Sequence, residues 1–357
     1  MKVSNGNGNS GTTRIGYKRR LGFLGLLLLL AVVMVAACGK NENQAGGAAT
    51  QTTGEAAEAA AGESTKTVQH IFGETAIPAQ PMRIVSIGLE DMLLALDVPL
   101  VQANGMEGYY LYDRLQEKNV PLLYAGAGIN YEAILAEKPD LILVLSGLVP
   151  DQEAYDKISR IAPTLVYDRD EWKTSIVKIG QALGLENQAN TVIQAYDEKL
   201  AQAHDSIVQA IGTDKTVALI RPSEKDLQLF LPRFAYGSVL YNDLGLSPAA
   251  FVTESQNESA EDTSASTLSL EKLPEFDADY LFTTAGGSLS PEIDFKKALE
   301  VVTGVEKLQV WQSIPAVKLK HSYKLSARHW MLSGPIADGM KIDDVVAAVT
   351  GQGQPSP

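Results

Sequence analysis

Short runs of apolar residues alternate with segments of helical periodicity along most of the chain after residue 80. Such runs are typical of strands that are buried on both faces of a parallel sheet. The predicted strands are 83–88, 100–103, 141–145, 164–167, 216–221, 280–283 and 322–325, and the predicted helices include 91–96, 132–136 and 172–183. This alternation predicts an α/β fold with mostly parallel sheets flanked by helices. The polar, acidic segment 253–266 is predicted to be an exposed loop.

One long helix is predicted between Gly184 and Gly212, because the 27 residues between them contain neither glycine nor proline. Apolar residues recur there at steps of three and four, which gives a helix of about 40 Å. The remaining chain of about 290 residues is too long for one typical core. We therefore expect two α/β lobes, at 66–184 and 212–357, joined by a connecting helix at 185–211. A helical connector is stiff, so lobe closure is expected to be small.

Two segments that start 139 residues apart, 130–143 and 269–282, match each other in pattern. In the first, Glu132 is followed eight positions later by Asp140, and in the second Glu271 is followed eight positions later by Asp279. Each aspartate immediately precedes a run of strand residues. Two similar lobes would thus offer a glutamate at equivalent places, which suits a two-fold symmetric partner. The alternative is that both are solvated glutamates on ordinary α/β units.

The N-terminus has the pattern of a lipoprotein signal peptide over residues 1–37. A basic region is followed by an apolar run from Leu21 to Ala37, and small residues precede Cys38. Cys38 is the predicted lipidation site, although a cysteine at the end of a transmembrane helix is the alternative. It is also the only cysteine of the chain, so no internal disulfide is possible. Residues 38–65 are poor in large apolar residues and predict a disordered tether with a reach of about 30 Å.

Charge and missing motifs exclude several classes of function. The net charge of −13 becomes about −18 once residues 1–37, with their five basic residues, are removed, which argues against a nucleic acid partner. The four histidines show no metal-ligand spacing, so no bound metal is expected. The chain has no dinucleotide fingerprint, nucleophile elbow or phosphate loop, so it is not expected to be an enzyme.

In several segments the chain resembles the iron-siderophore substrate-binding lipoproteins of ABC importers. The segments that carry the resemblance are 77–85, 132–143, 161–164, 179–184, 241–246 and 268–282. The resemblance implies two lobes of periplasmic-binding-protein type joined by a long helix, with the ligand in a shallow cleft between them. It also implies that Glu132 and Glu271 form salt bridges with arginines of the membrane permease.

Such a cleft is expected at the carboxyl ends of the strands. Candidate ligand residues at or near these ends are Arg221, Arg328, Trp330, Arg233, Tyr236, Tyr109 and Tyr110. A guanidinium offers a rigid fork of donors for hydroxamate or carboxylate oxygens around ferric iron. Tyrosines suit a ligand that is partly apolar and partly rich in oxygen. For the arginines the alternative is a surface position, and for Trp330 it is a place in the core.

Taken together, the sequence predicts an extracytoplasmic, monomeric receptor that is anchored to the cell membrane by a lipid on Cys38. The receptor would capture a ferric siderophore and deliver it to an ABC permease. Iron would stay inside its chelate, with no permanent cofactor on the protein. Few basic residues are available for the cleft, which favours hydroxamate ligands. The alternatives are a haem or corrinoid receptor, in which His329 or a tyrosine could be the axial ligand of haem, and a lipid-anchored enzyme or adhesion domain.

Overall fold

The computed structural model describes residues 64–233, 235–260 and 263–351. The predicted signal peptide, Cys38 and nearly all of the predicted tether lie outside the described residues. The described chain begins with a hairpin of β1 (Thr65–His70) and β2 (Gly73–Pro78), which the sequence did not predict. Among the described residues, no helix combines the length and the apolar character needed to span a membrane.

The N-terminal lobe is built on a parallel sheet of five strands in the order β5-β4-β3-β6-β7. Its strands are β3 (Ile84–Ile87), β4 (Leu100–Asn104), β5 (Leu122–Leu123), β6 (Leu141–Leu145) and β7 (Thr164–Tyr167). The segments between them contain α1 (Glu90–Ala95), α2 (Tyr112–Glu117), α3 (Tyr131–Ala136), the short η1 (Ser146–Leu148) and α4 (Gln152–Ser159). Strands β3 and β7 are buried along their whole length, which confirms the interpretation of these apolar runs as strands buried on both faces of the sheet.

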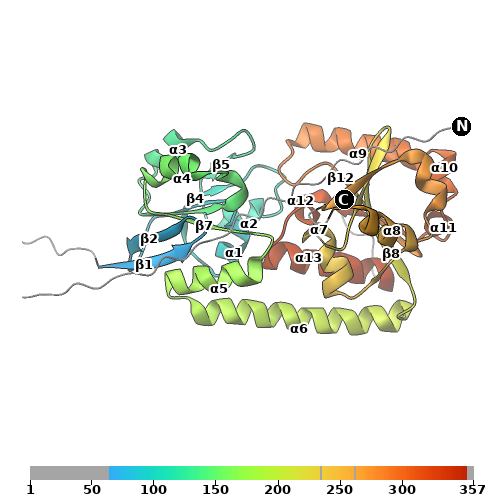
Figure 1. The fold of residues 1–357 in the computed structure, drawn as a ribbon, viewed down its shortest axis with the longest axis horizontal. Helices are drawn as coiled ribbons and strands as arrows, with labels where there is room; N and C mark the ends of the chain where they lie inside the picture. Colours follow the sequence, from blue (N-terminus) through green and yellow to red (C-terminus); the bar gives the residue numbers. More distant parts are fainter. Residues whose placement is uncertain (1–63, 234, 261–262, 352–357) are drawn as a thin grey trace, which may run out of the picture. The chain divides into compact units, whose positions relative to one another are not determined.

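Two helices follow the first sheet. Helix α5 (Trp172–Leu183) has the predicted bounds and ends where Gly184 adopts a left-handed conformation with φ +72°. The long helix α6 (Glu186–Ile211) lies within one residue of its prediction. Figure 1 shows α6 running beside α5 and then beside α13 (Pro335–Thr350), so that it contacts helices of both lobes. The prediction of two lobes joined by one long α-helix is thus confirmed.

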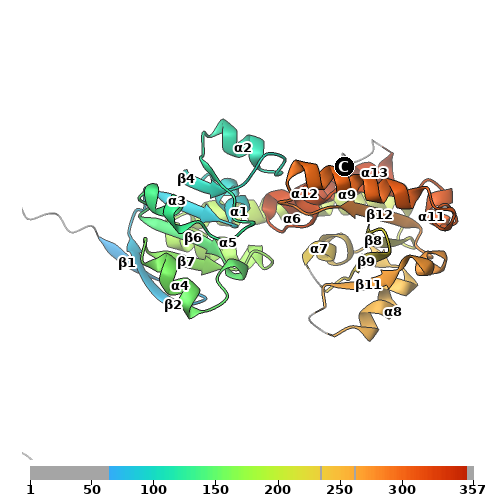
Figure 2. The same cartoon turned by 90° about the horizontal axis from the view of Figure 1, so that it is seen from above.

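The C-terminal lobe is built on a mixed sheet in the order β11-β9-β8-β12-β13, with β10 (Ser247–Pro248) also pairing with β8 (Figure 2). The strands are β8 (Thr216–Pro222), β9 (Asp226–Phe230), β11 (Ala265–Ser269), β12 (Tyr280–Ala285) and β13 (Ser322–Ser326). Strands β8, β12 and β13 are parallel, whereas β9 and β11 run antiparallel to their neighbours. The other elements are α7 (Ala235–Ser238), η2 (Val239–Asp243), α8 (Ala250–Glu258), η3 (Leu270–Glu275), α9 (Glu292–Glu306), α10 (Gln309–Gln312), α11 (Pro315–Lys318) and α12 (Ala327–Trp330).

The prediction of an exposed loop at 253–266 was wrong. Most of α8 and the start of β11 occupy that segment. Four polar residues of α8 are exposed, at 253, 254, 257 and 258, but Val252 is buried and the ring of Phe251 stacks on Phe276 at 3.9 Å between centroids. Two apolar residues at the start of a polar stretch are thus enough to hold a helix against the sheet, because packing outweighs composition.

One hydrophobic core continues from one lobe into the other. It contains Leu143 and Tyr167 of the first sheet, Tyr196 of α6, and Leu219 and Phe282 of the second sheet. Because α5, α6 and α13 contribute buried residues to the same cluster, the lobes are joined by packing as well as by the chain.

Candidate functional site

The two matching segments form matching pieces of structure in the two lobes. Asn130 caps α3 through its side chain, and Ser269 caps η3 in the same way. Glu132 and Glu271 lie in the first turns of these helices, and both are exposed. The strand that follows each helix, β6 or β12, pairs in parallel with the first strand of its sheet. The two glutamates therefore hold equivalent positions in the two lobes.

Arg221 stands near the carboxyl end of β8, beside a pocket of about 620 Å³. Its guanidinium donates to the Gln228 side chain and to the Gly286 carbonyl, and it lies 5.5 Å from the centroid of the Phe230 ring. Burial lowers the pKa of Arg221 from its ordinary value. The pocket is lined by residues of β8, β9, β11 and α9 and by Gly286 at the end of β12. It is of the size that small ligands use in proteins.

Arg328 is nearly buried and occupied by partners of its own lobe. Its guanidinium donates to the carbonyls of Ser288 and Ser290 and forms an ion pair of 3.0 Å with Glu292. Gly108 of the N-terminal lobe comes so close that a methyl group there would lie 3.0 Å from the Arg328 guanidinium. Arg328 thus lies where the two lobes touch, with its charge largely compensated by Glu292.

Trp330 lies in the core, which is the alternative that the sequence left open. Its side chain has no exposed surface, and its indole N–H donates to Asp344 at 2.8 Å. His329 is buried beside it and contacts the same carboxylate through Nε2 at 2.7 Å. A ligand cannot stack on Trp330 in this conformation, and the buried His329 ring already contacts Asp344 through Nε2.

Arg233 lies in the turn that follows β9, and Tyr236 lies in α7. Arg233 is exposed and donates to the backbone carbonyls of Gln256 and Ala260. Tyr236 is half-buried, with its ring edge-on to Phe230 at 6.0 Å. Because Phe230 also faces Arg221, the structure groups Tyr236 with Arg221, whereas Arg233 is tied to the end of α8.

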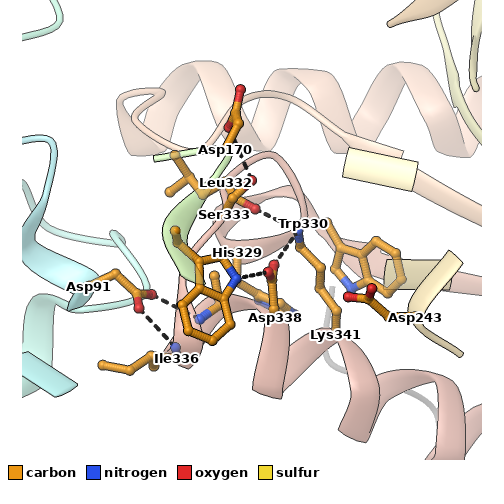
Figure 3. A network of polar contacts seen from close by, with 12 residues as sticks. Asp91, Asp170, Asp243, His329, Trp330, Leu332, Ser333, Ile336, Asp338 and Lys341 are labelled. Atoms are coloured by element: carbon orange, nitrogen blue, oxygen red, sulfur yellow. Dashed lines mark hydrogen bonds and ion pairs between the residues drawn. The ribbon is translucent and has the colours of Figure 1, made fainter. Parts of the chain in front are cut away.

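Tyr109 and Tyr110 lie in the loop between β4 and α2, with their rings edge-to-face at 4.8 Å. Tyr109 is buried, and the Tyr110 hydroxyl donates to Asp91 at 2.6 Å. The same carboxylate accepts the backbone N–H groups of Ile336 and Ala337 at the start of α13 (Figure 3). Tyr110 and the first turn of α13 are therefore hydrogen-bonded to the same carboxylate, and Tyr109 packs against Tyr110.

Two more contacts connect the N-terminal lobe to the segment 333–341. The Ser333 hydroxyl donates to Asp170, and the Trp172 indole N–H donates to Asp338 at 2.8 Å (Figure 3). Asp338 also pairs with Lys341, which is fully buried. Burial raises the pKa of Asp338 above its ordinary value, partly offset by the charge of Lys341. We call these contacts, together with those of Asp91, the interlobe network.

Arg169 is a candidate that the sequence reading missed. It follows β7 within the loop that carries Asp170, and its Nε atom is buried with no hydrogen-bond partner among the described residues. Its charge lowers the pKa of Tyr109 and of Tyr110, although burial raises both well above their ordinary value. Its position just past the carboxyl end of a predicted strand was the one available signal.

The part of the chain that the structure describes holds no group of three or more histidine, cysteine or acidic side chains arranged to bind a metal ion. The site offers guanidinium and phenol groups instead. Such groups donate hydrogen bonds to anionic or strongly polar oxygens, so they suit an oxygen-rich ligand better than a bare cation.

Comparison with known sequences places this geometry in context. A model of the periplasmic binding protein family matches residues 90–328. The iron(3+)-hydroxamate-binding protein FhuD of Bacillus subtilis strain 168 is 29% identical over 343 residues, covering 95% of this chain and 99% of that protein. The probable siderophore-binding lipoprotein YfiY of the same organism is 25% identical over 328 residues, covering 89% of this chain and 95% of that protein.

Solved structures show the same fold. The FhuD fold-family component of a Fep/Fec-like ferrichrome ABC transporter from Bacillus subtilis has a TM-score of 0.63 at 25% identity, covering 79% of this chain and 98% of that chain. SirA of Staphylococcus aureus, complexed with staphyloferrin B, has a TM-score of 0.66 at 23% identity, covering 80% of this chain and 98% of that chain.

Proposed function

Because this chain belongs to the periplasmic binding protein family, we propose that it is the extracytoplasmic receptor of an ABC importer and that its cargo is a ferric siderophore. The observation that carries the proposal is the end-to-end match to an iron(3+)-hydroxamate-binding protein. The internal geometry agrees with it, since two lobes built on similar α/β units meet at loops that present arginines and tyrosines. The protein would bind and release its cargo without chemical change.

The hydroxamate class is favoured by the charge of the site. Arg328 is compensated by Glu292, so Arg221 and Arg169 remain as the main donors of positive charge. A ferric trihydroxamate needs few countercharges, because three singly charged hydroxamates balance the iron. A triply charged catecholate complex would need more. In this proposal Arg221 and Arg169 donate to iron-bound oxygens, while Tyr110, packed against the buried Tyr109, contacts the apolar parts of the chelate.

Delivery and anchoring complete the proposed function. Glu132 and Glu271 would pair with basic residues of a two-fold symmetric permease, because they hold equivalent, exposed positions in the two lobes. Cys38 would carry the lipid that keeps the receptor, as a monomer, at the outer face of the cell membrane. The naming of a relative as a siderophore-binding lipoprotein supports this arrangement.

The test is a binding titration of the purified chain with a panel of ferric hydroxamate, carboxylate and catecholate siderophores, followed by tryptophan fluorescence. We expect quenching by the hydroxamates, and a loss of affinity of about tenfold in Arg221→Lys and in Arg169→Gln, as for lost hydrogen bonds to a charged group. Arg160→Gln, on an exposed arginine, is the matched control. A flat wild-type response to every hydroxamate and carboxylate chelate would overturn the proposal, and quenching by haem alone would replace it.

A further inference from the structure

The carboxylate of Asp91 contacts three groups from two distant parts of the chain. Its Oδ1 accepts the Ile336 N–H at 2.8 Å, and its Oδ2 accepts the Ala337 N–H at 2.9 Å and the Tyr110 hydroxyl at 2.6 Å. The residue is only 3% exposed. Figure 3 shows the carboxylate facing the first turn of α13 from the other lobe.

The contact with α13 has the form of a helix cap provided by another lobe. The first N–H groups of a helix have no partner within the helix, and the positive end of the helix dipole favours an anion there. The N-cap residue of α13 itself is Gly334, which has no side chain to serve as a cap. A Cβ at Gly334 would lie 2.4 Å from the Asp91 carboxyl carbon, so glycine is needed for the carboxylate to enter.

An amide could not replace this carboxylate. Each of the two oxygens receives one backbone N–H, so the NH₂ end of an asparagine would point at a donor in either orientation. Asparagine has nearly the same volume as aspartate. The substitution Asp91→Asn therefore removes the bonding pattern while leaving the packing almost unchanged.

Tyr110 connects the cap to the proposed ligand site. It belongs to the loop that follows β4, in which Tyr109 packs against it and Gly108 is close enough to Arg328 of the other lobe that an added Cβ would lie 3.0 Å from the guanidinium. Of the groups bonded to Asp91, one is thus in the loop proposed to face the ligand and two are in α13. A displacement of either partner changes the position of the shared carboxylate.

We propose that Asp91 is a positioning residue that couples the ligand-facing loop of the N-terminal lobe to helix α13 of the C-terminal lobe. The inference rests on the proposed function, because it assigns the loop of Tyr109 and Tyr110 to ligand capture. Ligand that orders this loop also orders Asp91, and Asp91 in turn holds the start of α13. Coupling of this kind is reciprocal, so loosening the start of α13 lowers ligand affinity by the same factor.

The experiment combines ligand titration with amide hydrogen exchange. A ferric trihydroxamate is the probe, and the variants are Asp91→Asn, Tyr110→Phe and the double variant. We expect Asp91→Asn to bind about tenfold more weakly and to exchange faster at Ile336 and Ala337, as expected for lost hydrogen bonds to a charged group. In the wild type, ligand should slow exchange at both amides, and in Tyr110→Phe this slowing should disappear. The double variant should bind no more weakly than Asp91→Asn.

Asp97→Asn is the matched control, because it makes the same chemical change on an exposed residue just beyond α1. Asp97 has φ +55°, which asparagine accepts readily, and it forms an exposed ion pair with Lys118. It should leave affinity and exchange unchanged. The coupling would be overturned if Asp91→Asn bound the ligand as tightly as the wild type, or if ligand still slowed exchange at Ile336 and Ala337 in Tyr110→Phe. It would also be overturned if the affinity losses of the two single variants multiplied in the double variant.

The ligand-free arm separates this inference from the proposed function. If the wild type binds no siderophore, the proposed function fails, but exchange of the ligand-free Asp91→Asn protein still decides the coupling. Faster exchange in both α13 and residues 105–111 supports it. Faster exchange in α13 alone overturns it.

Discussion

Asp140 and Asp279 have the same role in the two lobes. Each stands just before one strand, and its carboxylate accepts backbone N–H groups at the start of the strand beside it. Asp140, just before β6, accepts the N–H groups of Met82 and Arg83 ahead of β3 at 2.7 and 2.8 Å. Asp279, just before β12, accepts the Thr216 N–H at the start of β8 at 2.9 Å. The pattern shared by the two sequence segments thus has a physical basis, since each aspartate sets the register of two central parallel strands.

Loss of either aspartate should destabilise its lobe. In Asp140→Ala and Asp279→Ala, backbone N–H groups at the start of a central strand lose a charged acceptor, which costs about 1–3 kcal/mol in the free energy of unfolding. Urea unfolding followed by circular dichroism measures the change. Asp277→Ala is the control, because Asp277 is exposed and close to Asp279 in the chain. Equal stability of Asp279→Ala and Asp277→Ala would show that the strand-start bonds contribute nothing.

The two exposed glutamates should matter for transport and leave capture unaffected. We expect Glu132→Ala combined with Glu271→Ala to lower siderophore-dependent iron uptake by at least about tenfold, because each substitution removes one partner of a proposed ion pair with the permease. Affinity for the ferric siderophore should be unchanged, because both side chains are exposed in the first turns of α3 and η3 and neither belongs to the proposed ligand site. Uptake of radioactive iron by cells that depend on this receptor measures transport, and fluorescence titration of the purified protein measures affinity.

The matched control for that experiment removes two exposed glutamates elsewhere, in Glu153→Ala combined with Glu258→Ala. It changes the net charge equally and should leave uptake at the wild-type level. An equal loss of iron uptake in both double variants would indicate a general effect of net charge. Uptake that stays intact without Glu132 and Glu271 would end the docking proposal.

The buried pair of Asp338 and Lys341 should tolerate joint replacement better than single replacement. Lys341→Met leaves the buried Asp338 carboxylate without its counter-ion, and breaking such a pair costs about 3–5 kcal/mol in the free energy of unfolding. Asp338→Leu combined with Lys341→Met should recover much of the loss, because neither charge then remains buried. Lys297→Met, which breaks an exposed pair with Asp294, is the control and should cost less than about 1 kcal/mol. A double variant less stable than Lys341→Met would contradict this account.

Stability should depend on pH through the acids of the interlobe network. Burial raises the pKa of Asp91 to about 6, with a smaller contribution from the charge of Asp338, although the bonds from Tyr110, Ile336 and Ala337 oppose the rise. The folded chain therefore holds this proton more tightly than the unfolded chain. Protonated Asp91 therefore stabilises the folded chain by about 2–3 kcal/mol. This stabilisation is fully present below the ordinary aspartate pKa of about 4 and is lost as the pH rises through 6.

Unfolding midpoints of the wild type and Asp91→Asn between pH 4.5 and 7.5 test this dependence. The wild type should lose more stability than the variant as the pH rises. His70 acts in the opposite sense in both proteins, because burial lowers its pKa and its contribution is lost as the pH falls below about 6.5. Identical pH profiles for the two proteins would show that Asp91 carries no such contribution.

The sequence predicted the fold well where the pattern was local. Helix α5 ends at Gly184 and helix α6 ends at Gly212, both helices have clear periodicity, and the strands of the parallel core are short, mainly apolar runs. The resemblance to siderophore-binding proteins is also confirmed as membership of the periplasmic binding protein family. The antiparallel strands β9 and β11 and the first hairpin were not predicted, because they mix polar with apolar residues and lack a continuous apolar run.

The candidate site was harder to predict than the fold, because its contacts join residues far apart in the chain. Asp91 and Ile336 are separated by 245 positions, and Trp172 and Asp338 by 166. Nothing near Trp330 in the sequence distinguishes an indole that donates to Asp344 from one that stacks on a ligand. Arg169 became a candidate only from the structure, in which its buried Nε atom has no hydrogen-bond partner among the described residues.

The hairpin of β1 and β2 determines how the described fold would respond to a pulling force. Thr65 pairs with Pro78 at its open end and His70 pairs with Gly73 at its closed end. A load applied at Thr65 therefore breaks the residue pairs one after another, starting at the open end. The last pair to break is that of His70 and Gly73, and the His70 ring also accepts the Val166 N–H of β7. The hairpin would yield at low force and absorb extension before any strain reached the sheets and the proposed ligand site.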